Sequence, residues 1–504
     1  MQSTHSEPNG RFIDFNNERF YRIENIDAMP SFFISMVSHS DHWLFISSNT
    51  GLTAGRVSAV SALFPYEAVD KIEDNPENSG NKTIIRVKSG NDWINWEPFS
   101  TATDNAKSKQ RNLYKHILGN QLCFEEIHHE LKLTYRFTWQ VSDEFGFVVQ
   151  AQLINHNSHV IELEILDGLQ NILPAGAPQE VQTNASNLVD AYRCNELLEP
   201  SGLAVFSLYS GITDKPEPVE GLKANTVFCL GLDNSKTLLS SRQVNAFRMG
   251  HNIQTEHQIR GIRGAYLVKA PLQLKANGQH AWKFIANVEQ SQQQIAELNS
   301  RLKADSSAIN SALEKSVHHG AMSLTNLLSK ADARQKTASE IDDVHHYANV
   351  LFIAMRGGVF DNHYWIHTQD FVNDIKHFNK KVFAQHTDFL ESLPEHILLF
   401  ELQDQIKLLN DSQLERLCTD YLPITFGRRH GDPSRPWNKF AINIKDNTGE
   451  PLLSYEGNWR DIFQNWEALL LSYPEFIENV ISKFVNASTI DGYNPYRITK
   501  KGID

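Results

Sequence analysis

The segment 428–494 combines aromatic side chains with arginines and carboxylates, and it contains very little lysine. A pyranose ring has apolar C–H faces that stack on aromatic rings, and its rim of hydroxyls needs paired donors and acceptors. The combination therefore predicts a sugar-binding site in this segment. Its aromatic members are Trp437, Tyr455, Trp459, Trp466 and Tyr493, with Tyr496 just after it, and its polar members are Arg428, Arg429, Arg435, Glu456, Arg460 and Asp461.

Residues 458–470, NWRDIFQNWEALL, have the pattern of an amphipathic helix. Asn458 is a favourable N-cap residue, and Asp461 would lie in the first turn, where negative charge is stabilised. Apolar residues recur at helical spacing, and the polar residues fall on the opposite arc. An ordinary surface helix is one interpretation. Because the polar face lacks the lysine–glutamate pairs of such helices, we favour a ligand-lining helix. The expected sugar contacts are Arg460, Asp461, Gln464, Asn465, Trp459, Trp437 and Tyr455.

A second polar cluster, formed by Arg428, Arg429, His430 and Arg435, precedes this helix. Arginine binds phosphate oxygens through paired hydrogen bonds, so the cluster is a candidate site for inorganic phosphate as a co-substrate. Arginine is also preferred in buried ion pairs, and an interdomain contact explains the cluster equally well. We expect no other cofactor. We also expect no metal site, because neighbouring histidines such as His345 and His346 direct their side chains apart.

Composition narrows the class of protein. The chain has 504 residues, of which 41% are hydrophobic and 21% are charged, which indicates a large protein of more than one domain. A net charge of −13 argues against nucleic acid as a partner. The four cysteines lack paired spacing, so we expect reduced thiols. The N-terminus is polar and no stretch is apolar enough for a signal or a membrane span, so a cytoplasmic location without membrane contact is expected.

Two patterns of hydrophobic residues divide the chain. Short segments rich in β-branched and aromatic residues, separated by turn clusters, predict an antiparallel β-sandwich over residues 1–288. Residues 289–340 have apolar positions near heptad spacing and are predicted to form linker helices. Residues 341–504 contain several helices in tandem, joined by loops with glycine, proline and aromatic residues. This arrangement indicates the first half of an (α/α)6 barrel, in which inner helices line a central pocket.

The segment GNWRDIFQNWEAL resembles the F-R-D-Q-L-Q-D segment of glycoside hydrolase family 94, which contains cellobiose, chitobiose and cyclic β-glucan phosphorylases. The resemblance implies a β-supersandwich of the galactose-mutarotase type followed by a six-hairpin barrel. It also implies that Arg460 and Asp461, with Gln464 beside them, hold the sugar whose bond is broken. Asn465 stands where the family pattern has an aspartate, so this position keeps its hydrogen-bonding capacity and loses the charge.

The length of the helical part affects the expected mechanism. A closed six-hairpin barrel needs about twelve helices and more than about 250 residues, and the stretch from Ile341 to Asp504 is too short for that. We therefore expect this chain to be the N-terminal portion of a longer or split protein. The resemblance implies that the general acid lies beyond Asp504. Within the chain, Glu456 and Asp461 are the candidate catalytic carboxylates.

The predicted function is that of a carbohydrate-active enzyme that breaks or forms glycosidic bonds in β-linked oligosaccharides or glucans. An inverting phosphorylase would need one carboxylic acid and inorganic phosphate. An inverting hydrolase would need a second carboxylate, about 6.5–9.5 Å from the first, to activate water. A glycan-binding or scaffold module without catalysis is the third alternative. The expected partners are an oligosaccharide or glucan and either a second copy of the chain or a missing C-terminal half.

Overall fold

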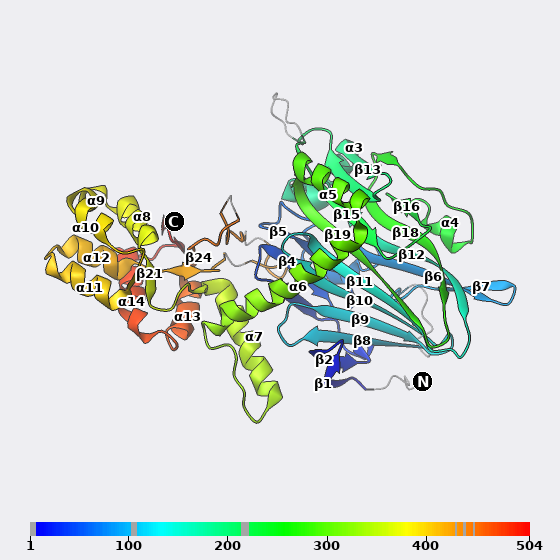
Figure 1. Cartoon of the computed structure of the whole chain (residues 1–504), viewed down its shortest axis with the longest axis horizontal. Helices are drawn as coiled ribbons and strands as arrows, with labels where there is room; N and C mark the ends of the chain where they lie inside the picture. Colours follow the sequence, from blue (N-terminus) through cyan, green and yellow to red (C-terminus); the bar gives the residue numbers. More distant parts are fainter. Residues whose placement is uncertain are drawn as a thin grey trace. The chain divides into compact units, whose positions relative to one another are not determined.

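The computed structural model describes residues 7–101, 108–212, 221–428, 431–436, 440–446 and 449–503. The chain falls into two compact units. The first comprises Met1–Ala321 and Asp432–Trp437, and the second comprises Met322–Gly431 and Asn438–Asp504. Each unit is built around its own hydrophobic core, and Figure 1 labels the elements of both.

Antiparallel strands form most of the first unit. Among the described residues the larger sheet has eleven strands: β1 (Asn9–Phe15), β2 (Glu18–Glu24), β8 (Lys109–His116), β9 (Leu122–His128), β10 (Leu133–Ser142), β11 (Gly146–Asn155), β19 (Gln279–Ser291), β15 (Lys223–Leu230), β14 (Leu203–Leu208), β13 (Arg193–Leu198) and β17 (Gln258–Arg260), in this spatial order. The smaller sheet has the order β16 (Lys236–Leu238), β18 (Gly264–Leu274), β12 (Ile161–Ile172), β6 (Gly80–Ser89) and β7 (Asp92–Trp96). A third sheet joins β3 (Phe33–Val37), β4 (His42–Ser47) and β5 (Leu52–Arg56).

The core of the first unit lies between these sheets. Tyr135, Phe137 and Trp139 alternate along β10 and are buried in the same cluster as Ile85 on β6 and Ile165 on β12. Side chains two positions apart on a strand point to the same face, so apolar residues at alternate positions give each sheet one apolar face. Two sheets joined through such faces make a β-sandwich.

Two helices cover part of the outer face of the larger sheet. Helix α5 (Gln292–Ala304) begins with a capping box, in which the Ser291 hydroxyl accepts a hydrogen bond from the backbone of Gln294. Leu302 of α5 and Ile309 and Leu313 at the start of α6 (Ser306–Ser329) are buried in one cluster with strand residues of that outer face. The apolar positions predicted to form linker helices therefore pack on the sandwich (Figure 1).

The second unit consists mainly of helices. They are α7 (Glu340–Gly357), α8 (Thr368–Phe378), α9 (Lys380–Gln385), α10 (Thr387–Ser392), α11 (Leu399–Leu408), α12 (Ser412–Asp420), α13 (Trp459–Leu469) and α14 (Ile477–Ala487). Short antiparallel ladders connect them: β20 (Val359–Phe360) with β23 (Ile424–Thr425), β21 (Trp365–His367) with β22 (His396–Leu398), and β24 (Glu456–Asn458) with β25 (Arg497–Thr499) and β26 (Gly502–Ile503).

The β20–β23 ladder brings together two points far apart in the sequence. Val359 pairs with Thr425 and Phe360 with Ile424, and the backbone N–H of Asp361 donates to the carbonyl of Pro423 at 2.9 Å. The chain therefore leaves and re-enters the rest of the unit at one place, which we call the neck. The segment 361–423 between its two strands carries α8 to α12.

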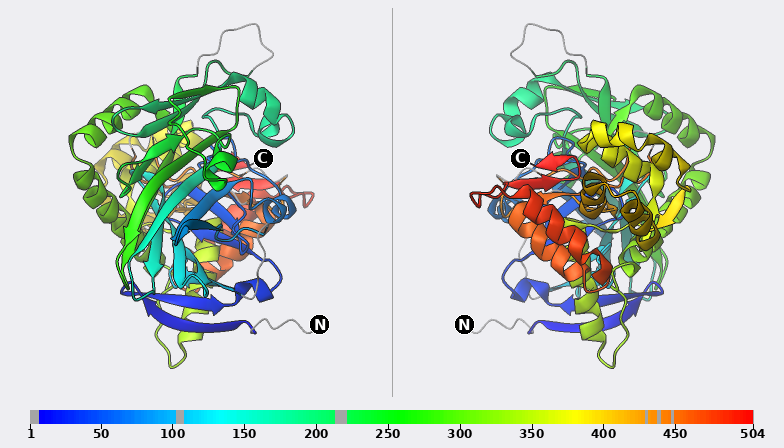
Figure 2. Two further views of the ribbon diagram at one scale, coloured as in Figure 1. Left: turned by 90° about the vertical axis from the view of Figure 1, so that its right-hand side faces the viewer. Right: turned by 90° about the vertical axis from the view of Figure 1, so that its left-hand side faces the viewer.

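Helices α7 and α13 pack closely because Gly357 has no side chain. The indole Nε1–H of Trp466 donates to the Gly357 carbonyl at 2.8 Å, and a Cβ atom at Gly357 would lie 2.7 Å from the Cβ of Asn465. On its other side α13 packs on α14, where the rings of Trp459, Phe463 and Trp466 meet Phe484 edge to face. Figure 2 shows α13 and α14 side by side in orange to red in its right-hand view.

The prediction of a large antiparallel β-sandwich followed by a helical region is confirmed. The six-hairpin barrel, and with it the division at residues 288 and 340, stay predictions. Within the described residues, no helix is both long enough and apolar enough to span a lipid bilayer. The cytoplasmic location stays a prediction.

Candidate functional site

A polar pocket of about 760 Å³ lies within the second unit. One wall comes from α8, another from residues 441–446 and 452–456, and a third from the C-terminal end of β25. Carboxylates, amides and amines outnumber apolar groups along these walls. The lining residues are Asp370, Asn373, Asp374, His377, Gly427, Ala441, Asn443, Lys445, Asp446, Leu452, Leu453, Ser454, Tyr455, Glu456, Thr499, Lys500 and Lys501.

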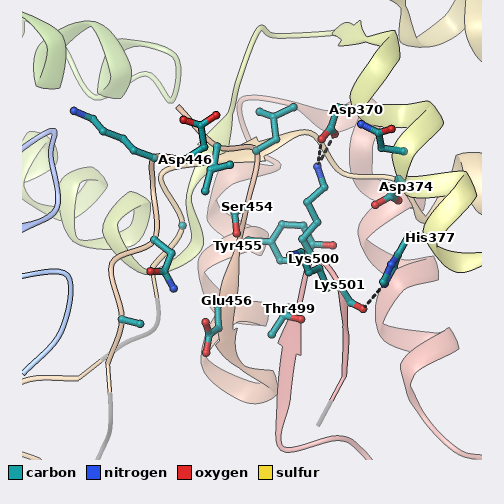
Figure 3. Close-up of a pocket in the computed structure, with 17 residues that line it drawn as sticks. Asp370, Asp374, His377, Asp446, Ser454, Tyr455, Glu456, Thr499, Lys500 and Lys501 are labelled. Carbon is teal, nitrogen blue, oxygen red and sulfur yellow. Dashed lines mark hydrogen bonds and ion pairs between the residues drawn. The ribbon is translucent and has the colours of Figure 1, made fainter. Parts of the chain in front are cut away.

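Helix α8 contributes two carboxylates, Asp370 and Asp374, from one face. Residues four apart are neighbours on a helix, and like charges at this spacing repel unless cations or hydrogen bonds compensate them. Lys500 provides that compensation for Asp370, because its Nζ donates to Oδ1 at 2.6 Å. The Tyr421 hydroxyl donates to Oδ2 of the same carboxylate at 2.6 Å. Figure 3 shows Lys500 extending from the end of β25 to Asp370 on α8.

Asp374 has a different environment. Burial raises its pKa to about 6, the negative charge of Asp370 adds to this effect, and the lysines Lys483 and Lys500 oppose it. Burial also lowers the pKa of Lys483, whose neighbours Asp374 and Asp420 favour its charged form. A carboxyl group with a pKa near 6 is partly protonated in weakly acidic solution, so Asp374 can donate a proton as well as accept a hydrogen bond.

The opposite part of the pocket is held by β24 and the residue before it. Glu456 Oε1 accepts a hydrogen bond from Nη1 of Arg497 at 2.7 Å, across the β24–β25 ladder. Tyr455 is buried, its ring lies edge to face against Trp466 with centroids 5.1 Å apart, and burial raises the pKa of its hydroxyl. The backbone N–H of Lys500 donates to the Tyr455 carbonyl at 3.1 Å. Tyr455 and Glu456 are therefore the predicted site residues that line this pocket.

The polar residues predicted on α13 lie elsewhere. The side chain of Arg460 is 85% exposed, and its Nε lies 3.9 Å from Oδ1 of Asp461. Gln464 is exposed. Asn458 occupies the N-cap position, as expected, but its side chain makes no cap hydrogen bond there and instead donates to Asp461 at 3.2 Å. Neither Arg460, Asp461 nor Gln464 lines the described pocket.

Two further predicted contacts on α13 are partly or fully enclosed by neighbouring helices. Asn465 is buried where α13 meets Gly357 of α7, so packing occupies its inner side. Trp459 is half-buried, and its ring lies edge to face against Phe484 of α14 with centroids 5.1 Å apart. Asn465 thus lies at a helix–helix contact, and its sugar-binding role remains a prediction.

The arginine cluster is divided between the two units. Arg428 belongs to the second unit, is buried, and holds its guanidinium carbon 4.4 Å from the centre of the Phe426 ring. Arg435 belongs to the first unit and is exposed. Arg429, His430 and Trp437 lie outside the described residues. Neither unit by itself therefore holds both Arg428 and Arg435, and the phosphate site stays a prediction.

Asp370, Asp374 and Lys500 line the pocket but are not among the residues predicted from the sequence. A usable signal exists for the two carboxylates, since D-x-x-x-D on an amphipathic helix places two acids on one face. No comparable signal exists for Lys500, which lies 130 positions from its partner Asp370. Only the folded chain brings this lysine to the helix.

Comparison with known proteins gives one family match. Residues 360–423 match the model of glycoside hydrolase family 149 insertion domain 1. These limits coincide with the neck, whose strands pair Phe360 with Ile424. The match connects the chain to carbohydrate-active enzymes of the glycoside hydrolase type. No curated protein sequence matches the chain. The resemblance to family 94 stays a prediction.

Several solved structures are similar to this chain at low sequence identity. A bacterial glucoamylase complexed with acarbose shares 9% identity with a TM-score of 0.39, over 92% of this chain and 60% of that one. A family GH92 α-mannosidase from Bacteroides thetaiotaomicron shares 10% identity with a TM-score of 0.30, over 70% of this chain and 39% of that one. A GalM/aldose epimerase homologue from C. elegans shares 8% identity with a TM-score of 0.27, over 52% of this chain and 100% of that one. The chain thus spans 60% of the length of the glucoamylase.

Proposed function

We propose that this chain is part of a carbohydrate-active enzyme that breaks or forms glycosidic bonds in β-linked oligosaccharides or glucans, with inverting phosphorolysis as its reaction. One observation carries the proposal: the segment that matches a glycoside hydrolase family model contributes the α8 wall of the polar pocket. A function in carbohydrate chemistry accounts for both the matched segment and the composition of the pocket.

The pocket offers what a hydroxyl-rich ligand requires. Carboxylates accept hydrogen bonds from sugar hydroxyls, lysines donate them, and the amides of Asn373 and Asn443 do both. Tyr455 is the one Phe, Tyr or Trp among the described lining residues, and its ring is buried. The sugar is therefore held mainly by hydrogen bonds in the described part of the pocket, and less by stacking than the sequence predicted.

The two reactions make different demands on the residues. Phosphorolysis with inversion needs one acid to protonate the leaving oxygen, because phosphate itself attacks the sugar. Hydrolysis with inversion needs a second carboxylate as base. In the pocket, Asp370 and Glu456 are paired with Lys500 and Arg497, and Asp446 accepts a hydrogen bond from the backbone N–H of Glu450 at 3.0 Å. Asp374 instead has the raised pKa of a group that can carry a proton. One protonatable acid with paired neighbours supports the phosphorylase over the hydrolase.

A glycan-binding module without turnover is the second candidate. The pairing of Asp370 with Lys500 and of Glu456 with Arg497 favours this candidate. Carboxylates in ion pairs accept hydrogen bonds from hydroxyls well and transfer protons poorly. The two candidates make the same prediction for binding and differ in turnover.

Binding is tested by titrating the chain calorimetrically with β-linked gluco-oligosaccharides of each linkage. We expect the variant Asp374→Asn to bind the preferred oligosaccharide about tenfold more weakly, as loss of a charge-assisted hydrogen bond would produce. The matched control is Asp404→Asn on α11, whose side chain is 79% exposed and is not among the residues that line the pocket. Absence of binding in the wild type, or equal binding by both variants, would contradict the assignment of the pocket.

Turnover is tested by incubating the same oligosaccharide with and without inorganic phosphate. A sugar phosphate formed only with phosphate supports the phosphorylase, and a free reducing sugar formed without phosphate supports the hydrolase. Binding without either product supports the binding module.

A further inference from the structure

Three exposed side chains with metal-binding chemistry meet on the β21–β22 ladder. His367 ends β21, His396 begins β22, and Glu395 directly precedes it. One potential ligand atom from each of the three lies within 4.8 Å of the other two. Histidines that are adjacent in the sequence direct their side chains apart and do not form a metal site. This cluster instead joins histidines from two paired strands, whose side chains project from the same face.

The ladder register places the two histidines directly opposite each other. His367 pairs with His396, and their rings lie edge to face with centroids 5.1 Å apart. Directly opposed residues of an antiparallel pair have Cβ atoms about 4.5–5.5 Å apart and project from the same face. Two imidazoles at this spacing can turn a nitrogen each toward one point between them, which adjacent histidines in a single strand cannot do.

The backbone beneath the cluster is well fixed. The N–H of Thr368 donates to the carbonyl of Glu395 at 3.0 Å, and the Thr368 hydroxyl donates to the carbonyl of Pro394 at 2.5 Å. Ile366 and Ile397, the middle residues of the two strands, are both buried in the core of the unit. The strands therefore fix the backbone positions of the three residues, while their side chains face solvent.

The chemistry of the three groups selects the ion. Two imidazole nitrogens and one carboxylate oxygen, with a fourth position open to water, form a common ligand set for Zn²⁺. Bond lengths of about 2.0–2.2 Å place tetrahedral ligands about 3.3 Å apart. Ligand atoms that lie up to 4.8 Å apart must therefore approach by up to about 1.5 Å, which exposed side chains achieve by rotation about their own bonds.

From this geometry we infer that His367, His396 and Glu395 form a surface site for a divalent transition metal ion, with Zn²⁺ as the best match. The ion would bridge two points that are distant in the sequence, the start of α8 and the start of β22. His367 is the N-cap residue of α8, the helix that carries Asp370 and Asp374 into the pocket. Metal binding would therefore stabilise the position at which this helix begins.

The test uses the full chain without a histidine tag, stripped with a chelator and titrated with Zn²⁺ against a chromophoric chelator. We expect one zinc ion bound per chain. His367→Gln and His396→Gln should each weaken binding by at least about tenfold, because loss of a direct ligand exceeds the effect of losing an outer-shell partner. The matched control is His345→Gln, an exposed histidine on α7 outside the cluster. It should bind zinc as the wild type does.

A second readout follows coordination directly. Co²⁺ in the same site should show the intense visible absorption of a tetrahedral ion, and His367→Gln should abolish it. The inference is overturned if the wild type binds no zinc stoichiometrically, or if the double variant His367→Gln/His396→Gln binds it with unchanged affinity. Circular dichroism of each variant confirms that the substitutions leave the fold intact.

Discussion

Burial changes the acid–base chemistry of the Asp374 side chain. Its neighbour on the same helix face, Asp370, is paired with Lys500 and Tyr421, while Asp374 lies where desolvation outweighs two nearby lysines. Two carboxylates one helical turn apart thus have different environments. Separation of this kind is how proteins assign a proton-carrying role to one acid of a pair.

The pH dependence of stability tests this environment. The folded-state pKa of Asp374, about 6, lies above its ordinary value of 3.8. Its contribution to stability is therefore fully present below pH 3.8 and is lost as the pH rises through about 6. We expect the Tm of the wild type, relative to that of Asp374→Asn, to fall between pH 4 and pH 7. A difference in Tm that stays constant across this range would contradict the raised pKa.

At the scale of elements, the contact between α7 and α13 depends on Gly357. A methyl group there would meet the Cβ of Asn465 at 2.7 Å and the indole of Trp466 at 3.3 Å, and both belong to a helix that cannot move away without disturbing α14. Overpacking of this kind costs about 1–3 kcal/mol. We therefore expect Gly357→Ala to lower the free energy of unfolding by that amount in urea titrations.

Gly320→Ala is the matched control for that substitution. Gly320 is also helical, but its added methyl group would first meet the imidazole of His39 at 3.2 Å, a side-chain end that can rotate. A small change in stability is expected there. Equal losses for the two variants would show that helix propensity or a general effect, and not the α7–α13 contact, is responsible.

Elements were easier to predict from the sequence than their neighbours in space. The amphipathic pattern at 458–470 predicted a helix, and α13 spans Trp459–Leu469, because periodicity reports a local preference. The same pattern favoured a ligand-lining face, whereas the structure leaves Arg460 and Gln464 exposed and buries Asn465 against α7. Which helix covers a polar residue depends on contacts across many positions. Tyr455 and Glu456, which the composition of the segment indicated, line the pocket, whereas Lys500 lies far from its partner Asp370 in the sequence and had no local signal.

At the scale of the whole molecule, the two units have separate cores. Asp167 lies fully buried in the first unit, where its carboxylate accepts hydrogen bonds from Thr83 at 2.7 Å and from the indole of Trp282 at 2.6 Å. Asp167→Asn would place an amide N–H against one of these donors, at a cost of about 1–3 kcal/mol. Gly357 lies in the second unit. Each substitution thus affects one core directly.

Calorimetry on the full chain can separate the two cores. We expect two unfolding transitions, with Asp167→Asn lowering the temperature of one and Gly357→Ala lowering that of the other. Asp233→Asn, at an exposed position of the first unit, should move neither. A single transition shifted by both substitutions would show that the units unfold together.

The neck at β20–β23 also has a consequence for how quickly the second unit can fold. Trp466 and Gly357 are 109 positions apart, and closing a long loop before other contacts exist is slow because its entropy must be lost first. Once Phe360 has paired with Ile424, the loop that must still close between Gly357 and Trp466 is much shorter. The entropy lost on closing it is therefore smaller. We therefore expect segment 361–423 to fold first, the neck to close next, and α7 to pack on α13 last. The position of the neck in the chain thus determines the order in which the second unit folds.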